Sequence, residues 1–304
     1  MEPDAIEVRG LTKRYGGLEA LRGVDLTVRP GDVYGFLGRN GAGKSTTIRI
    51  LMGITRPTGG VVRMFGDQAG RDLVGWRQRI GYVAQEQSFY GWMTPNAMGR
   101  FVRGFFPRWD DAEFARLIRV LDVPPARRIR TFSGGMKVKL ALAIALAHRP
   151  PLLLLDEPTA GLDPVARREF LEIVRDEAER SGRTTFFSSH LITEIELVAK
   201  RLAILEGGLT RYEGGVRELV ERVRLVRASE LADAAVLHEQ LAASGLALLH
   251  EEVREGERRI AVEADEPERF DALAAIAPDV VIESMPLEEV FIAMVRRGPG
   301  AAAG

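Results

Sequence analysis

A glycine-rich segment at residues 38–46 has the spacing needed to hold a phosphate group. Four residues separate Gly38 from Gly43, and Lys44, Ser45 and Thr46 follow. Glycines let the backbone wrap so closely that successive N–H groups converge on a phosphate, and a helix that follows adds its positive N-terminal end. Lys44 can reach the terminal phosphates of a nucleoside triphosphate, Ser45 can ligate Mg²⁺, and Thr46 can contact the α-phosphate side. The residues expected to contact the phosphates are Gly38, Asn40, Gly41, Ala42, Gly43, Lys44, Ser45 and Thr46.

Two carboxylates follow a run of four leucines further along the chain. Leu152 to Leu155 predict a buried strand, and Asp156 and Glu157 come directly after it. Ligands of open α/β sheets bind at the carboxyl ends of the strands. Asp156 is therefore placed to hold Mg²⁺, directly or through water, and Glu157 to polarise a water as general base, which contributes about 10²- to 10⁴-fold in rate. A merely solvated strand end is the alternative, and the phosphate loop upstream makes it the weaker one. The two motifs together predict an enzyme that binds MgATP and hydrolyses it.

The elements that must position these residues can be predicted from hydrophobic patterns. Strands are expected at 6–9, 24–28, 33–37, 152–155, 184–188 and 202–205, and helices from about 45 to 52 and from 165 to 181. Strand patterns disappear after residue 86, and helical periodicity appears at 111–121 and 135–147. We expect an α/β fold with a P-loop NTPase core, a mixed sheet flanked by helices, over residues 1–85 and 148–217. A helical subdomain is expected over residues 86–147.

The composition becomes acidic and rich in alanine from about residue 222. The predicted order there is strand, helix, strand, strand, helix, strand, helix, at 222–226, 233–243, 247–252, 258–264, 268–276, 280–283 and 288–295. This order is typical of a small α+β domain of the split βαβ type, expected over residues 218–297. Residues 298–304 are Gly, Ala and Pro only and are expected to be a disordered tail.

Charge and composition bear on the partners. Lys plus Arg number 42 and Asp plus Glu 43, so no general basic field exists and nucleic acid is not an expected partner. The chain has no cysteine, which excludes disulfides and thiolate metal sites. No run of about 18 apolar residues occurs, so no helix is expected to span a bilayer. Work at a membrane would then require a separate anchoring protein.

The segment Thr-Phe-Ser-Gly-Gly-Met-Lys at 131–137 narrows the class. Together with the phosphate loop and the carboxylate pair, it resembles the signature of an ATP-binding cassette (ABC) ATPase, which usually reads Leu-Ser-Gly-Gly-Gln. The resemblance implies that Ser133, Gly134 and Gly135 open a helix whose end closes on the γ-phosphate held by another subunit. Phe132 and Met136 depart from the usual Leu and Gln. The serine and both glycines remain, so phosphate contact is expected to survive, whereas the missing glutamine bears on ribose contact or subunit communication.

Four more markers of that family stand in the expected order. Tyr15 matches the aromatic residue that stacks on adenine, although a tyrosine in the strand core is an equal alternative. Gln85 matches the glutamine that senses Mg²⁺ and the attacking water, with Gln87 (nearby) the weaker candidate. Asp163 matches the loop that crosses the dimer interface, and His190 matches the histidine that contacts the γ-phosphate. The resemblance covers roughly residues 5 to 215.

The resemblance also implies partners. One cassette provides one phosphate loop and one signature, so a head-to-tail homodimer or a pair of close paralogues is expected around two MgATP. The compact helical insert, the single cassette and the segment 286–291 resemble bacterial subunits that export drugs, antibiotics or lipids. Such a subunit is cytoplasmic and peripheral, on the cytoplasmic face of the membrane, and drives an integral-membrane permease. The alternatives are a soluble ABC ATPase without a permease, acting on a protein or nucleic-acid partner, and a phosphotransferase, which has no need of Ser133 or His190.

Four large apolar residues after Gln85 allow two interpretations. They are Phe89, Tyr90, Trp92 and Met93. An exposed aromatic group would suit the docking of a permease helix. Equally, these residues could form the core of the helical insert.

Overall fold

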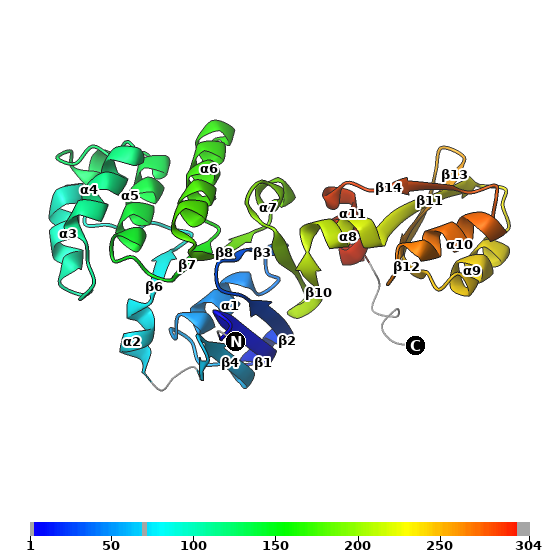
Figure 1. Ribbon diagram of the computed structural model, residues 1–304, viewed down its shortest axis with the longest axis horizontal. Helices are drawn as coiled ribbons and strands as arrows, with labels where there is room; N and C mark the ends of the chain where they lie inside the picture. The colour runs from blue at the N-terminus through cyan, green and yellow to red at the C-terminus, as the bar shows by residue number, and fades with distance from the viewer. Residues whose placement is uncertain (1–2, 69–71, 297–304) are drawn as a thin grey trace. The chain divides into compact units, whose positions relative to one another are not determined.

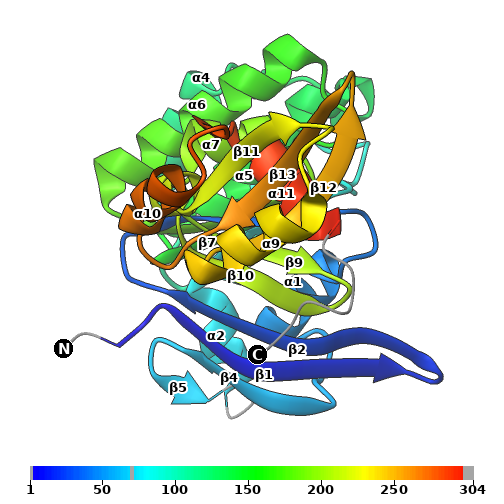
Figure 2. The ribbon, with the colours of Figure 1, turned by 90° about the vertical axis from the view of Figure 1, so that its right-hand side faces the viewer.

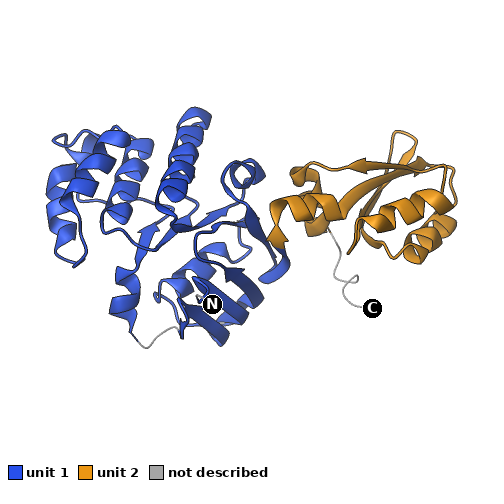
Figure 3. Ribbon diagram, in the orientation of Figure 1, with its two compact units in different colours: residues 1–213 blue, residues 214–304 orange. Residues whose placement is uncertain are grey.

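The computed structural model describes residues 3–68 and 72–296, and the expected tail at 298–304 lies outside them. The chain forms two compact units that divide between Glu213 and Gly214 (Figure 3). Each unit has its own sheet, and each is described separately below.

The first unit is built on a mixed sheet, which comprises ten strands within the described residues. The strands are β1 (Ile6–Tyr15), β2 (Leu18–Val28), β3 (Val33–Gly38), β4 (Gly59–Met64), β5 (Asp67–Gln68), β6 (Ile80–Val83), β7 (Leu152–Asp156), β8 (Thr184–Ser189), β9 (Arg201–Glu206) and β10 (Leu209–Gly215). Their order across the sheet is β5-β4-β1-β2-β10-β9-β3-β8-β7-β6. The antiparallel part, β5-β4-β1-β2, lies together at the bottom of Figure 2, whereas β9, β3, β8, β7 and β6 run parallel.

Three central parallel strands position the predicted site. Every residue of β3, β7 and β8 is buried, as expected for short apolar strands covered on both faces. Leu37 of β3 pairs with Ser189 of β8, and Asp156 of β7 pairs with Ser188. The carboxyl ends of the three strands therefore lie at one edge of the sheet, next to one another.

Some helices of this unit cover the two faces of the sheet, and others form a cluster beside it. They are α1 (Lys44–Leu51), α2 (Leu73–Gln78), α3 (Pro95–Arg103), α4 (Asp111–Val120), α5 (Gly134–Ala147), α6 (Pro164–Ser181) and α7 (Ile192–Val198), with a 3₁₀ turn at Ile129–Thr131. Tyr34 and Phe36 of β3 pack in one core with Ile48 and Leu51 of α1, whereas Gly35 faces Ile195 of α7 on the other side. Helices α3, α4 and α5 lie side by side next to β6 and β7 (Figure 1).

The second unit combines one antiparallel sheet with four helices within the residues described. Its strands are β11 (Val223–Ser229), β12 (Ala247–Arg254), β13 (Glu257–Glu263) and β14 (Val281–Ser284), in the order β12-β13-β11-β14. Its helices are α8 (Val216–Arg222), α9 (Ala234–Ala243), α10 (Glu268–Ile276) and α11 (Leu287–Arg296). Alternate strand residues such as Val226, Ile260 and Val262 form a core with Leu237 of α9 and Leu273 of α10.

The predicted α/β fold with a small α+β unit is confirmed, and several short elements were missed. The region 86–147 contains helices and no strand, as predicted. Helices α2, α3, α7 and α8 were not expected, because short helices carry too few turns to show clear periodicity. The strand predicted from residue 222 begins instead at Val223, since Arg222 is the last residue of α8.

Candidate functional site

The phosphate-loop residues connect the buried strand β3 to α1. Gly43 precedes the helix with φ of 110°, and a Cβ there would lie 2.5 Å from Leu21 Cδ2 and 2.9 Å from the Ala20 carbonyl oxygen. Only glycine suits both this backbone and this close approach. Lys44 is 4% exposed, and its Nζ donates hydrogen bonds to the carbonyl oxygens of Gly38 at 2.6 Å and Arg39 at 3.2 Å. The lysine therefore lies folded back over its own loop.

Lys44, Glu157 and His190 form one chain of polar contacts across three strand ends. Lys44 Nζ lies 2.9 Å from Glu157 Oε1, and His190 Nδ1 lies 2.8 Å from Glu157 Oε2. Burial would raise the pKa of Glu157, but the hydrogen bond and charge of Lys44, and then those of His190, hold the pKa below its usual value. Glu157 is thus ionised at neutral pH. Its φ of 43° is uncommon for a residue with a side chain and indicates a constrained backbone at this position.

Asp156 lies in a neighbouring oxygen-rich group. Its Oδ1 accepts hydrogen bonds from Ser45 Oγ at 3.1 Å and Ser188 Oγ at 3.2 Å, and Ser188 Oγ accepts one from Glu157 N at 3.1 Å. Burial raises the pKa of Asp156, although the two hydroxyl groups favour the carboxylate. A hydroxyl and a carboxylate oxygen side by side are the ligand types that Mg²⁺ prefers, and Mg²⁺ is usually held by one or two carboxylates together with substrate phosphates. The donor set at Ser45 and Asp156 fits that ion.

The outer side of the phosphate loop is open. A cavity of about 450 Å³ is lined there by Asn40, Gly41, Ala42 and His190, with Arg39, Glu206 and Gly207. Thr46 is partly buried in the first turn of α1. Three strand ends and one helix N-terminus thus bring Lys44, Ser45, Asp156, Glu157 and His190 together, and His190 also lines the cavity.

Among the described residues that line the cavity at the phosphate loop, Tyr15, Gln85 and Gln87 do not occur. Tyr15 ends β1, is 44% exposed, and has Lys13 Nζ 4.6 Å from its ring centroid. This exposure contradicts the alternative of a tyrosine in the strand core. Gln85 follows β6 and is exposed. The side-chain amide of Gln87 donates a hydrogen bond to the carbonyl oxygen of Ala84. Gln87 is therefore engaged locally, and Gln85 remains the freer of the two.

The signature residues lie at the start of another helix. Ser133 caps α5 by accepting a hydrogen bond from Met136 N at 3.3 Å, and Ser133 and Gly134 are exposed. Asp163 caps α6, accepting from Val165 N and Ala166 N at 3.0 Å each. Within the described residues, none of these residues lines the cavity at the phosphate loop. The structure of one chain does not bring the signature to its own phosphate loop.

Glu194 belongs to this site and was missed in the sequence. It is 2% exposed, accepts hydrogen bonds from Thr159 Oγ1 at 2.7 Å and Ser189 Oγ, and lies 3.3 Å from Arg167 Nε. Thr159 follows Glu157 closely and Ser189 precedes His190, so this carboxylate ties together the two loops that carry those side chains. The available signal was an acidic residue four positions after His190, among the apolar residues of α7.

This fold and this cluster of side chains define a P-loop ATPase. The family model described as "ABC transporter" matches residues 21–160. The chain is 35% identical over 241 residues to the bacitracin transport ATP-binding protein BcrA of Bacillus licheniformis, covering 77% of this chain and 78% of that protein. It is 38% identical to the daunorubicin/doxorubicin resistance ATP-binding protein DrrA of Streptomyces peucetius, covering 76% and 73%.

A solved structure shows the same relationship. The ATP-binding subunit of an ABC transporter superposes with a TM-score of 0.64 at 28% identity, covering 71% of this chain and 91% of that one. The chain belongs to the family of ABC transporter ATP-binding proteins. It is an ATP-binding, ATP-hydrolysing transporter subunit. Among the described residues, no helix is long and apolar enough to cross a membrane.

Proposed function

We propose that the chain is the ATPase subunit of a bacterial exporter and works as a head-to-tail pair around two MgATP. The carrying observation is the separation of two exposed half-sites: the open phosphate loop of α1 and the exposed Ser133–Gly134 end of α5. Each half-site lies at a helix N-terminus, which favours an anion, and a second copy, or a paralogue, could supply the missing half to each. The same arrangement would place Asp163 at the interface. The names of relatives that act in bacitracin transport, daunorubicin resistance and Nod factor export support the export direction.

Each site residue has a proposed role that follows from its position. Tyr15 would stack on adenine, and the backbone from Gly38 to Thr46 would surround the phosphates. Ser45 and Asp156, with Gln85 completing the set, would hold Mg²⁺, which supplies charge neutralisation at the phosphates when bound. From the partner, Ser133, Gly134 and Gly135 would contact the γ-phosphate. His190 would contact it from within the same chain.

The ion pair between Lys44 and Glu157 suggests how binding prepares hydrolysis. When phosphates arrive, Lys44 exchanges its 2.9 Å contact with Glu157 for the phosphate oxygens. The loss of this contact removes the strongest interaction that lowers the pKa of Glu157. The carboxylate then becomes a better acceptor for a proton from the attacking water, with His190 still holding its other oxygen. Substrate binding would thereby release the general base.

Glu157→Gln tests this arrangement. The amide cannot take a proton, so hydrolysis should fall by about 10²- to 10⁴-fold while ATP binding persists and a nucleotide-bound dimer accumulates. Light scattering in saturating MgATP measures the dimer, and phosphate release measures turnover. Glu196→Gln, at an exposed position of α7, is the matched control. A monomeric Glu157→Gln variant that turns over at the wild-type rate would contradict the proposal.

We also propose that the helical insert docks a permease helix on the cytoplasmic face of the membrane. Of the four apolar residues after Gln85, Tyr90 and Trp92 are 55% and 68% exposed and do not form the insert core, whereas Phe89 and Met93 are partly buried. Phe101 and Phe105 of the same insert are 45% and 61% exposed. Their rings form a continuous surface, with centroid separations of 6.1 Å for Tyr90–Trp92, 5.9 Å for Tyr90–Phe101 and 5.4 Å for Phe101–Phe105. Exposed aromatic clusters of this kind suit a hydrophobic partner. In this division of work, residues 1–85 and 148–217 bind nucleotide, 86–147 grip the permease, and 218–297 form the accessory domain.

Trp92→Ala tests the docking surface. We expect less permease to co-purify with the tagged chain from detergent-solubilised membranes. Ile54→Ala, which removes another exposed apolar side chain outside this surface, should leave recovery unchanged. Equal recovery with both variants would contradict docking through Trp92. An ABC ATPase that acts without a permease is not favoured, because the similar proteins are transport subunits.

A further inference from the structure

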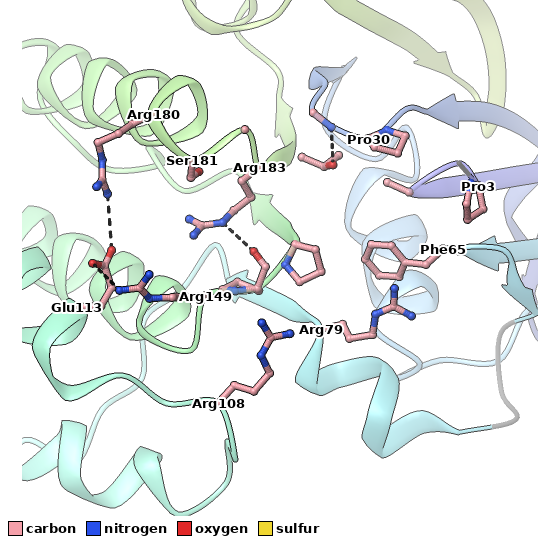
Figure 4. Close-up of a pocket in the computed structure, with 16 residues that line it drawn as sticks. Pro3, Pro30, Phe65, Arg79, Arg108, Glu113, Arg149, Arg180, Ser181 and Arg183 are labelled. Atoms are coloured by element: carbon pink, nitrogen blue, oxygen red, sulfur yellow. Dashed lines mark hydrogen bonds and ion pairs between the residues drawn. The ribbon is translucent and has the colours of Figure 1, made fainter. Parts of the chain in front are cut away.

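A second cavity lies at the opposite edge of the sheet from the phosphate loop. It has a volume of about 670 Å³ and is lined by residues that precede β3, β7 and β8 (Figure 4). Five arginines reach it from different elements: Arg79, Arg108, Arg149, Arg180 and Arg183. Its apolar lining includes Pro30, Phe65, Pro150 and Pro151. Strands of five or six residues separate the two edges by about 15–20 Å, so this cavity is distinct from the nucleotide site.

Most of the arginine charge at this cavity is already paired. Arg149 lies 2.8 Å from Asp110, and Arg180 lies 2.6 Å from Glu177. Arg79 stacks on the ring of Phe65, 3.8 Å from its centroid, and lies 3.8 Å from Asp67. Glu113, the carboxylate in the lining, contacts Arg116 and Arg180.

Two guanidinium groups remain without a carboxylate partner. Across residues 3–68 and 72–296, neither Arg108 nor Arg183 forms an ion pair. Arg183 is only 9% exposed; its Nε donates to the Pro150 carbonyl at 2.8 Å, and its Nη1 is buried with no hydrogen-bond partner among the described residues. Burial lowers the pKa of Arg183, and the charges of Glu177 and Glu113 offset only part of that effect, so a cost of keeping this charge away from water remains. An anion beside it would offset that cost.

The ends of two helices explain why some of these arginines lie at the cavity. The carboxyl ends of α5 and α6 lie at the cavity, and each carries a partial negative charge that cations offset. Arg149 and Arg180, near those ends, suit that structural role. Arg108 lies in the loop between α3 and α4 and makes no such contact, so its placement at the cavity is left unexplained by the helix ends.

We propose that this cavity binds a phosphate monoester whose organic part lies on the prolines and Phe65. A phosphate monoester carries a charge of about −1.5 to −2 at neutral pH, which matches the two unpaired guanidinium groups. Guanidinium groups bind phosphate oxygens in pairs of parallel hydrogen bonds. The volume lies within the range of about 300–1,000 Å³ found for small-molecule sites. The apolar side distinguishes an organic phosphate from a bare inorganic ion.

The test is calorimetric titration of the full-length chain, saturated with MgADP so that the phosphate loop is filled, with phenyl phosphate. We expect one binding site per chain. Arg108→Ala should weaken binding about tenfold, because it removes one charged donor from an exposed position without disturbing the core. Arg119→Ala removes an exposed arginine of α4 outside the cavity and should leave the affinity unchanged. The ATP affinity of Arg108→Ala should match the wild type.

A second arm identifies the source of the phosphate monoester. If the ligand is a lipid headgroup, the chain should float with phosphatidylcholine vesicles that contain phosphatidic acid, and this binding should depend on Arg108. If the ligand is free in solution, Arg108-dependent binding should appear in calorimetry with phenyl phosphate but not in flotation. Either result supports the proposal. If neither probe binds, or if Arg108→Ala and Arg119→Ala behave alike in both arms, the arginines serve the helix ends only and the proposal is wrong. If the wild-type chain failed to bind ATP, that result would instead contradict the ATPase function.

Discussion

The two edges of one parallel sheet carry opposite chemistry in this protein. At the carboxyl ends of β3, β7 and β8, one lysine, two carboxylates and a histidine lie together, and Glu157 contacts both Lys44 and His190. At the amino ends, five arginines line a cavity with few free carboxylates. The helix geometry explains part of the difference, since helices begin at the first edge and end at the second. A helix start attracts phosphate through its N–H groups, and a helix end attracts arginine through its carbonyl groups.

The comparison separates function from scaffold. We call the carboxyl ends of β3, β7 and β8 the carboxyl edge and their amino ends the amino edge. Substitutions at the carboxyl edge should change nucleotide binding and turnover. Substitutions at the amino edge should change the stability of the fold or ligand binding at the proposed second site. Each prediction below can break that division or make it sharper.

Among the substitutions that compare the two ends of the strands, Lys44→Ala should have the largest effect. The substitution removes the cation expected to reach the terminal phosphates, and ATP affinity should fall about hundredfold. Calorimetry with ATP measures this loss. Arg108→Ala, which removes a cation at the opposite edge, is the control and should keep the wild-type affinity. Similar losses in the two variants would break the division between the edges.

Glu194→Ala should come next. Glu194 is a positioning residue that accepts hydrogen bonds from Thr159 and Ser189, so its loss should loosen the loops that hold Glu157 and His190. We expect kcat to fall about thirtyfold with little change in KM for ATP, because the effect acts on the hydrolytic step.

Two comparisons separate this positioning role from general destabilisation. Glu194→Gln keeps an oxygen acceptor and should restore part of kcat. Glu196→Ala, two positions along α7 and exposed, should leave kcat unchanged. Equal rises in KM and falls in kcat for Glu194→Ala, without rescue by Gln, would indicate a purely structural role.

His148 makes the amino edge sensitive to acid. It is 2% exposed and stacks on Phe106 with ring centroids 4.1 Å apart. Burial first, and then the charges of Arg183 and Arg108, lower its pKa from 6.5 to about 4. Between these values the unfolded chain binds a proton that the folded chain does not. This histidine should therefore lower the free energy of unfolding by about 2 kcal/mol as the pH drops from 6.5 to 4.

Urea unfolding followed by tryptophan fluorescence measures this effect, because Trp76, Trp92 and Trp109 all lie in the first unit. His148→Gln removes the titrating group and should flatten that part of the pH dependence. His238→Gln, an exposed histidine of the second unit, is the control. An unchanged slope in His148→Gln would show that carboxylates alone set the acid sensitivity.

Tyr15→Ala should have the smallest effect. Base stacking on an aromatic ring contributes about 1–3 kcal/mol, and the 44% exposed ring should lie at the lower end, so KM for ATP should rise about tenfold. Tyr15→Phe keeps the ring and should restore the wild-type KM. If Tyr15→Phe behaves like Tyr15→Ala, the hydroxyl rather than the ring would carry the contact.

The nucleotide edge could be predicted well because its chemistry is local in sequence. The glycines, Lys44 and Ser45 stand within one loop, and Asp156 and Glu157 are consecutive. Ser133 and Asp163 were recognisable by their motifs, although only the structure shows that they cap α5 and α6. Glu194 was missed because its partners Thr159, Arg167 and Ser189 come from three separate segments.

By itself, the sequence determined the α/β class, the phosphate loop and the residue types at the carboxyl edge. These features depend on residues that are close together in the chain, so their spacing is enough to predict both the local backbone and the chemistry of the side chains. Only the tertiary structure decided that Lys44 pairs with Glu157, that Tyr90 and Trp92 are exposed, and that Arg108 and Arg183 share a cavity. The ion pair and the arginine-lined cavity depend on which strands are neighbours in the sheet. Residues more than 70 positions apart meet at its amino edge only after the parallel strands have paired.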